Sequence, residues 1–218
     1  MQEIFYFTYK LANILLLLTT LYALYKYINY KSTILLLLVI YLIVSTGVNF
    51  LVELNEQTFF LTKNNSHTLV HIFLVTHLIT FIYIILYVLG WPKKKIHRVC
   101  LLSFILYVFI FFIEKQTLSF YLATAINCLL AFLSIISLFK RISQLKLTTI
   151  SNEWASLILI GVSIFSFLNL PIILFFKELK KIISEKEFLE ISIISPIASI
   201  LFYLMIAYSI KCFTKKAI

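Results

Sequence analysis

TILLLLVIYLIVSTGVNFLVEL, residues 33–54, is the stretch that decides the fold. It contains a single charged side chain, Glu53. A helix needs about 20 mainly apolar residues to cross the hydrocarbon core of a bilayer, so this stretch predicts a transmembrane helix. Six further stretches share the pattern. Together they predict an all-α, polytopic membrane bundle of seven transmembrane helices, at residues 5–25, 33–54, 68–89, 96–113, 117–139, 154–176 and 191–213.

The composition agrees with a chain that lies in lipid. Of its 218 residues, 62% are hydrophobic and 13% are charged, whereas soluble domains are about 45–50% apolar and about 25% charged. Three glycines and three prolines are too few for long flexible linkers. Residues 1–218 are therefore expected to form a single transmembrane domain with no soluble catalytic domain.

The distribution of Lys and Arg predicts the orientation, because these residues are enriched in cytoplasmic loops. With the C-terminus in the cytoplasm and the N-terminus outside, twelve of the 19 basic residues fall inside: Lys26, Lys31, Lys93, Lys94, Lys95, Arg98, Lys140, Arg141, Lys146, Lys211, Lys215 and Lys216. We expect a multi-pass protein of a bacterial inner (plasma) membrane. The fourth stretch is short, and if it only dipped into the membrane, both termini would share one side.

Several polar side chains lie in or near the outer halves of the predicted spans. Ser45, Asn49 and Glu53 recur every four residues, which places them on one helix face. Polar groups in lipid usually face a bundle interior or a wet cavity. The candidates for an outward-facing polar pocket are Asn49, Glu53, His71, His77, Asn127 and Asn169. A buried hydrogen-bond network without a ligand is the alternative interpretation.

Glu53 and His71 are the best candidates for an ionisable pair. They belong to consecutive predicted helices and should lie at similar depth. A carboxylate beside an imidazole raises the pKa of the imidazole, which would allow a proton sensor or relay. An inert structural pair near the headgroups is the alternative. His67 and His71 have a spacing that could hold a metal, but two ligands alone are a weak signal.

Motifs of known enzyme and cofactor chemistry are absent from the sequence. It contains no Walker loop, GxSxG, HExxH, dinucleotide fingerprint or CxxC pair, and no Asp at all. Cys100, Cys128 and Cys212 are expected to act as small packing residues. We therefore predict no catalytic residues, no cofactor, no metal site and no enzymatic activity.

The net charge of +10 bears on the partners. Because the basic residues follow the predicted topology, anionic lipids at the cytoplasmic face of the bilayer suffice as their partner. This interpretation is favoured over a direct contact with nucleic acid. A cytosolic protein partner and a homo-oligomer are left open by the sequence.

Part of the sequence resembles a known group of proteins. The elements of the likeness are Asn49-Phe-Leu-Val-Glu53, Asn64-Asn65, Leu69-Val-His71-Ile, Asn127, and Asn152-Glu-Trp154 followed by Gly161 and Phe167-Leu-Asn169. In this order they resemble small, uncharacterised seven-helix membrane proteins frequent in Bacteroidota, and the likeness covers roughly residues 45–213. The chain departs from that pattern at His77, where an acidic residue is expected. In size and composition it also resembles the membrane accessory proteins of type VI-B CRISPR loci.

These features lead to two expectations about function. The first is a non-enzymatic sensor, regulator or accessory protein with an outward-facing polar pocket, and the second resemblance implies a membrane accessory of a phage-defence system. The alternative is a small-solute transporter. Seven spans fit a repeat of three plus one plus three helices, in which the short fourth span would be the linker.

Overall fold

The computed structural model describes residues 2–58, 63–113, 119–143 and 153–213. In these segments the chain is helical and contains no strand. The helices are α1 (Gln2–Tyr30), α2 (Thr33–Thr58), α3 (Lys63–Val88), α4 (Lys93–Ile113), α5 (Ser119–Ile142), α7 (Trp154–Ile182), α8 (Glu185–Ser192) and α9 (Ile194–Cys212). The predicted all-α class is confirmed.

Within the described part of the chain, seven helical stretches are long and apolar enough to cross a membrane, which confirms the predicted number of spans. They are Glu3–Tyr30, Thr33–Leu54, Thr68–Val88, Lys93–Phe112, Tyr121–Ile142, Trp154–Leu174 and Glu190–Cys212. The fourth has 20 residues, because the helix begins at Lys93 and so takes in the basic residues that the prediction left outside. By length and composition this helix can cross the membrane fully, so the argument for only six spans no longer applies.

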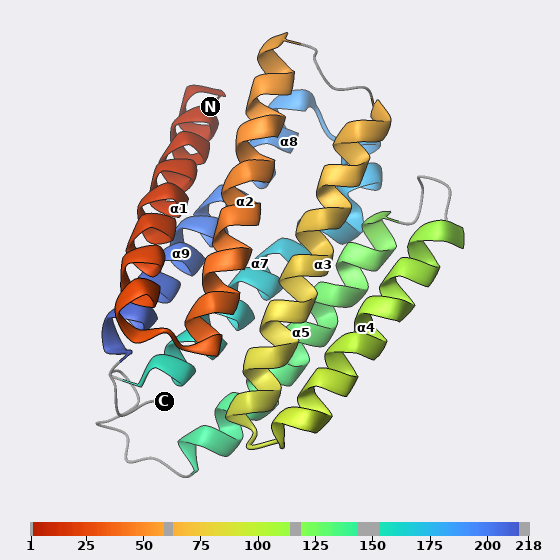
Figure 1. The fold of residues 1–218 in the computed structure, drawn as a ribbon. Coiled ribbons are helices and arrows are strands. Elements are labelled where there is room, and N and C mark those ends of the chain that lie inside the picture. Colours follow the sequence, from red (N-terminus) through yellow and green to blue (C-terminus); the bar gives the residue numbers. More distant parts are fainter. Residues whose placement is uncertain (1, 59–62, 114–118, 144–152, 214–218) are drawn as a thin grey trace.

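The spanning helices run alternately between two ends of the bundle (Figure 1). We call the end that carries the N-terminus and α8 the N-terminal end, and the end where α9 finishes the C-terminal end. Helices α1, α3, α5 and α9 run toward the C-terminal end, and α2, α4 and α7 run back. The chain therefore crosses the bundle seven times and finishes at the end opposite to its start.

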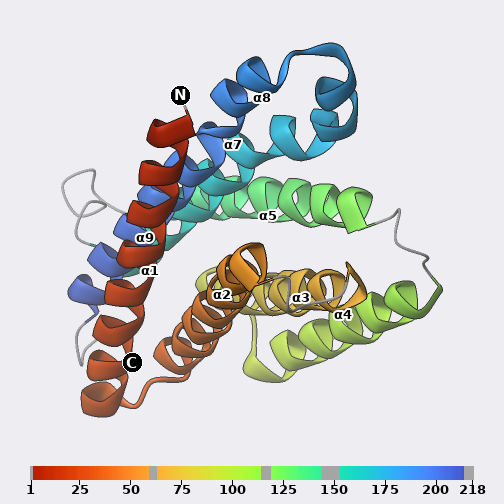
Figure 2. The same ribbon diagram turned by 90° about the horizontal axis from the view of Figure 1, so that it is seen from above.

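Six spanning helices form a closed ring in the order α1, α2, α3, α5, α7, α9. Each packs against the next, and α9 returns to α1 (Figure 2). Helix α4 lies outside the ring and packs against α3. Its outer face carries Leu102, Phe109 and Phe112, which are 65%, 63% and 81% exposed. Such a face fits lipid, because hydrocarbon tails solvate apolar side chains as well as a protein interior does.

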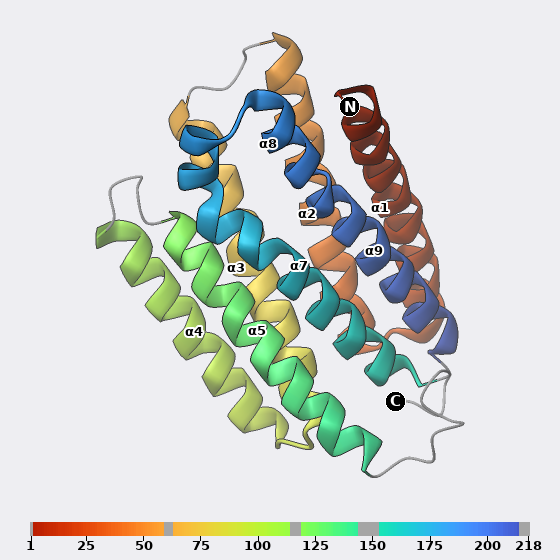
Figure 3. The same ribbon diagram turned by 180° about the vertical axis from the view of Figure 1, so that it is seen from behind.

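Helices α7 and α9 lie side by side along much of their length (Figure 3). Gly161 permits this approach, since a Cβ atom at that position would lie 3.0 Å from the Cβ atom of Met205. Small residues let membrane helices approach closely and gain packing contacts. Pro171 lies inside α7, where lipid-embedded helices tolerate proline because neighbouring groups satisfy the freed backbone.

The last predicted span, residues 191–213, is divided in the structure between two helices. The structure places a break at Ile193, between α8 and α9. Pro196, in the first turn of α9, has no N–H and cannot donate to the carbonyl of Ser192. The helical hydrogen bonds resume when the N–H of Ile197 donates to the carbonyl of Ile193, at 3.3 Å. Pro196 is thus a first-turn proline, at a position where its missing N–H costs the helix little.

Candidate functional site

A cavity of about 490 Å³ lies in the half of the bundle nearer the N-terminal end. Its walls come from α1, α2, α3, α7, α8 and α9, and most of the side chains are apolar or aromatic. They are Phe5, Tyr9, Ala12, Asn13, Val48, Asn49, Val52, Val70, Phe73, Phe165, Ile172, Phe188, Ser192, Ser195, Pro196, Ser199 and Tyr203. The volume falls in the range of about 300–1,000 Å³ that is usual for small-molecule sites. We call it the N-terminal cavity.

Two amides and a carboxylate connect α1 and α2 beside this cavity. The Nδ2 atom of Asn49 donates to Oδ1 of Asn13 at 3.2 Å. The Nδ2 atom of Asn13 donates in turn to Oε2 of Glu53 at 3.5 Å. Asn49 and Asn13 line the cavity, and Glu53 lies one helical turn beyond Asn49. Sequence reasoning named Asn49 and Glu53 but missed Asn13, although an amide in the middle of the first span was a usable signal.

A second polar contact joins α7 to α9 at the opposite wall. The hydroxyl of Ser195 donates to Oδ1 of Asn169 at 2.7 Å, and Nδ2 of Asn169 donates to the carbonyl of Phe165 at 2.8 Å. Asn169 is buried behind the wall, whereas Ser195 and Ser199 line it. Asn49 and Ser195, the hydrogen-bond partner of Asn169, therefore line the same cavity.

His77 lies deeper, in an aromatic cluster. This core aromatic cluster consists of Tyr41, His77, Phe81, Phe165 and Phe202, whose ring centroids lie 4.7–6.3 Å from their neighbours. The Nδ1 atom of His77 lies 3.3 Å from the hydroxyl of Tyr41. Within the described part of the chain, Nε2 of His77 is buried without a hydrogen-bond partner. Because Phe165 also lines the cavity, the cluster adjoins it on the side of the C-terminal end.

His71 is directed toward α4 and not toward Glu53. Its Nδ1 atom lies 2.7 Å from the hydroxyl of Tyr107, and that hydroxyl also lies 3.2 Å from the carbonyl oxygen of His71. A separate groove of about 170 Å³ between α3 and α4 is lined by both residues. Among the described residues, the only ion pair is elsewhere in the bundle. The predicted pairing of Glu53 with His71 is therefore not found.

Asn127 on α5 is also remote from the cavity wall. Its Nδ2 atom donates to the carbonyl of Ala123, one turn earlier, at 2.8 Å. Its Oδ1 atom is buried and lacks a partner within the described residues. Of the six predicted pocket residues, Asn49 lines the cavity, and Glu53, His77 and Asn169 contact residues of its wall. His71 and Asn127 lie elsewhere.

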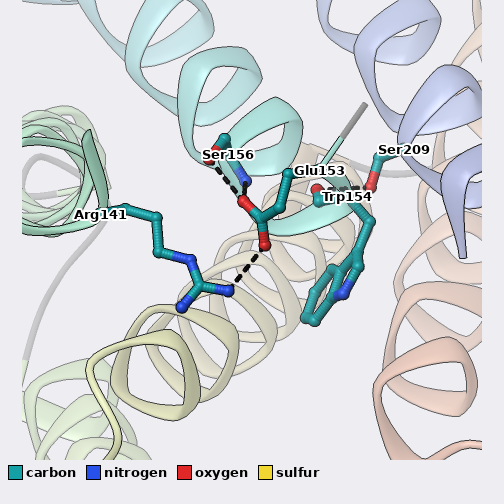
Figure 4. Close-up of polar contacts among 5 residues, drawn as sticks. All are labelled: Arg141, Glu153, Trp154, Ser156 and Ser209. Carbon is teal, nitrogen blue, oxygen red and sulfur yellow. Dashed lines mark hydrogen bonds and ion pairs between the residues drawn. The ribbon is translucent and has the colours of Figure 1, made fainter. Parts of the chain in front are cut away.

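A polar group that the sequence did not single out lies near the C-terminal end (Figure 4). An Nη atom of Arg141 donates to Oε1 of Glu153 at 2.8 Å, and Oε2 of Glu153 accepts hydrogen bonds from the backbone N–H and the hydroxyl of Ser156. Burial alone would raise the pKa of the Glu153 carboxyl, but the hydrogen bonds from Arg141 and Ser156 lower it below its usual value. The group ties α5 to the start of α7.

Next to it, the hydroxyl of Ser209 donates to the carbonyl of Trp154 at 2.8 Å, which ties α9 to the same turn (Figure 4). The indole ring of Trp154 packs against Phe213, with ring centroids 4.9 Å apart. Of the buried side-chain nitrogen and oxygen atoms in this group, the Nε atom of Arg141 is the one without a hydrogen-bond partner among the described residues. This geometry indicates a structural connection and not a binding site.

The described residues contain no cluster of three or more His, Cys, Asp or Glu side chains that could hold a metal ion. Comparisons of the chain with models of protein families, with curated proteins and with solved structures find no match. The function therefore has to be argued from the geometry of the chain itself.

Proposed function

We propose that this multi-pass membrane protein is a non-enzymatic receptor that binds a small molecule in the N-terminal cavity and acts as a sensor or regulator. The observation that carries the proposal is the cavity of about 490 Å³, whose apolar walls hold a few convergent amides and hydroxyls. A concave, mainly apolar site with few polar groups is the usual form of a small-molecule site. The core aromatic cluster adjoins the cavity on the side of the C-terminal end, and its buried, packed rings favour binding over passage.

We further propose that the N-terminal end faces the outside of a bacterial inner membrane. The basic side chains Lys93, Lys94, Lys95 and Arg98 are exposed at the opposite end, where α4 begins. Lys and Arg concentrate on the cytoplasmic side of membrane proteins. In this orientation the cavity belongs to the outer half of the bilayer, and the basic end meets anionic lipids.

Cysteine labelling checks the orientation. In a background without Cys100, Cys128 and Cys212, a membrane-impermeant thiol reagent is expected to label Glu187→Cys in intact cells. It is expected to label Lys94→Cys only after permeabilisation. Both parent side chains are exposed, so access depends on the side of the membrane and not on burial. The reverse pattern would contradict the proposed topology.

A ligand screen combined with a variant that blocks the N-terminal cavity tests the proposed receptor function. We expect at least one compound of a panel of neutral, cationic and anionic small molecules to stabilise the purified protein in detergent. A ligand at about 100 times its Kd adds about 2.7 kcal/mol, which raises the Tm of a chain of this size by several degrees. Ser199→Trp, on the cavity wall, should abolish the shift, because the indole occupies the ligand space.

The matched control is Leu204→Trp on the same helix, whose parent side chain is 48% exposed. This variant should retain the full Tm shift. If no compound stabilises the protein, or if Ser199→Trp and Leu204→Trp respond alike, the cavity is not a ligand site and the proposed function is wrong.

A small-solute transporter is the second candidate, and the position of α4 supports it. The triplets α1–α2–α3 and α5–α7–α9 alternate direction in the same sense and together close one ring, while α4 packs outside it on α3. Many transporters consist of two such repeats. Uptake of a stabilising compound into proteoliposomes, lost in Ser199→Trp, would favour this function over a sensor.

An accessory role beside a cytosolic partner, such as a phage-defence nuclease, would use the opposite end of the bundle. Its support is the exposed basic start of α4. Such a role is compatible with the receptor, because the two surfaces lie at different ends. Co-purification of a cytosolic protein from the native host, lost when Lys93, Lys94 and Lys95 are replaced by Gln, would support it.

A further inference from the structure

Glu53 is a charged group that contacts the wall of the N-terminal cavity through Asn13, and among the described residues it has no basic partner. Its carboxylate accepts a single, long hydrogen bond of 3.5 Å from Asn13, and none of the ion pairs among the described residues includes it. The side chain is partly buried and belongs to the last turn of the span Thr33–Leu54. A carboxylate at the end of a span without a basic partner leaves its negative charge available to a positively charged ligand group.

The carboxylate is connected to the cavity through two amides. Asn13 donates to Glu53 with one end of its amide and accepts from Asn49 with the other, so its orientation is fixed. Both asparagines line the cavity. The carboxylate of Glu53 is therefore connected to the cavity wall through Asn13, whose side chain is held in place by a hydrogen bond at each end of its amide.

The rest of the wall also favours a positive charge. The aromatic residues Phe5, Tyr9, Phe73, Phe165 and Tyr203 line the cavity, and aromatic rings attract cations. The described lining residues include no Lys or Arg, so an anion would find no counter-charge there. Lys10, the nearest basic residue in the sequence to the α1 part of the wall, is exposed and does not line the cavity.

We infer that the ligand class of the N-terminal cavity is an organic cation with an apolar body, such as an aryl- or alkylammonium compound. Its ammonium group would lie beside Asn13 and Glu53, and its apolar part would lie between the aromatic rings. This inference rests on the proposed receptor function and adds the charge of the ligand to it.

Three probes of nearly equal size and different charge test the inference: phenethylammonium, phenethyl alcohol and phenylacetate. Binding to the purified full-length protein in detergent at pH 7 is measured by calorimetry. We expect phenethylammonium to bind about ten times more tightly than the alcohol, and phenylacetate to bind more weakly than either. Glu53→Gln, which keeps an acceptor for Asn13, should remove most of the preference for the cation and leave binding of the alcohol unchanged.

Glu187→Gln is the matched control. Glu187 is exposed on α8 at the same end of the bundle and already accepts two hydrogen bonds from Ser184. Its loss should leave the preference for the cation intact. An effect of equal size in both variants would mean that only the general negative potential of this end matters, and it would overturn the assignment of Glu53.

Failure of the inference is distinguishable from failure of the receptor. If the alcohol binds as tightly as the cation, and Ser199→Trp abolishes both, the cavity is a ligand site but the charge assignment is wrong. If none of the three probes binds, the organic-cation inference is wrong, and the wider panel with Ser199→Trp decides on the receptor. Preserved selectivity for the cation in Glu53→Gln would also overturn the inference.

Discussion

Phe202→Ala is expected to lower the free energy of unfolding by about 3–5 kcal/mol, the usual loss for removal of a buried Phe side chain. Phe202 is fully buried, and its ring lies 4.7 Å from that of Phe165 and 5.5 Å from that of Phe81. Lipid tails are as apolar as the core, so the stability of a membrane bundle depends on packing contacts rather than on escape from water. Removing the ring leaves a void that the neighbouring rigid rings cannot fill.

The measurement is an unfolding titration with SDS in mixed micelles, followed by the far-UV circular dichroism of the helices. Leu204→Ala on the same helix is the control, since its side chain is 48% exposed. It should change the free energy of unfolding by less than about 1 kcal/mol, as substitutions outside the core usually do. Equal losses in the two variants would mean that the core aromatic cluster does not contribute more than the lipid-facing surface.

The spans could be predicted because the bilayer sets a length that the sequence has to match. Any apolar stretch of the required length is visible without knowledge of its neighbours. The fourth span was also predicted from its apolar stretch, although its first residue was placed at Ile96 instead of Lys93. Lysine can belong to the end of a spanning helix because its long side chain reaches the headgroups.

The site was only partly predictable, because helical phase gives the face of a residue but not the helix that covers this face. Glu53 and His71 were expected to meet across the hairpin of α2 and α3. In the structure Glu53 contacts Asn13 of α1, and His71 contacts Tyr107 of α4. Helix α2 packs against both α1 and α3, and α3 packs against α4 and α5 as well as α2. The sequence of the hairpin does not specify which of these neighbours a polar side chain contacts.

The polar cluster at the C-terminal end was missed for a different reason. In the sequence, Arg141 was recognised only as one of the basic residues of the predicted cytoplasmic side, and Glu153 was assigned to no site. Their contact depends on how α5 approaches the start of α7, which spacing along the chain does not specify. Ser134 on α5 and Ser163 on α7 share a hydrogen bond of 2.7 Å, as small polar side chains do where membrane helices approach closely.

Glu153→Ala is expected to lower the free energy of unfolding by about 2 kcal/mol, since hydrogen bonds to charged groups contribute about 1.5–3 kcal/mol. The pair with Arg141 is partly exposed, at 15% of the Glu153 side chain and 33% of that of Arg141. The loss should therefore stay below that of a fully buried ion pair. The change also removes the acceptor for the backbone N–H of Ser156 near the start of α7.

A double-mutant cycle with Arg141→Met separates the ion pair from the bonds to Ser156. We expect a coupling of about 1 kcal/mol, because the two side chains are in direct contact. A coupling near zero would mean that the bonds to Ser156 account for the whole effect of Glu153. Glu187→Ala, at an exposed site on α8, is the control and should change stability little.

The pH dependence gives a second, independent measure of the same group. The hydrogen bonds from Arg141 and Ser156 lower the pKa of Glu153 in the folded protein below its usual 4.5, despite the opposing effect of burial. A lowered pKa means that the unfolded chain binds the proton more readily. The stabilisation is therefore complete above about pH 4.5 and is lost as the pH falls through the lower pKa of the folded state. The difference in unfolding free energy between the native protein and Glu153→Gln should be constant near neutral pH and shrink in this acidic window; a difference that grew with acidification would contradict the assigned role of Glu153.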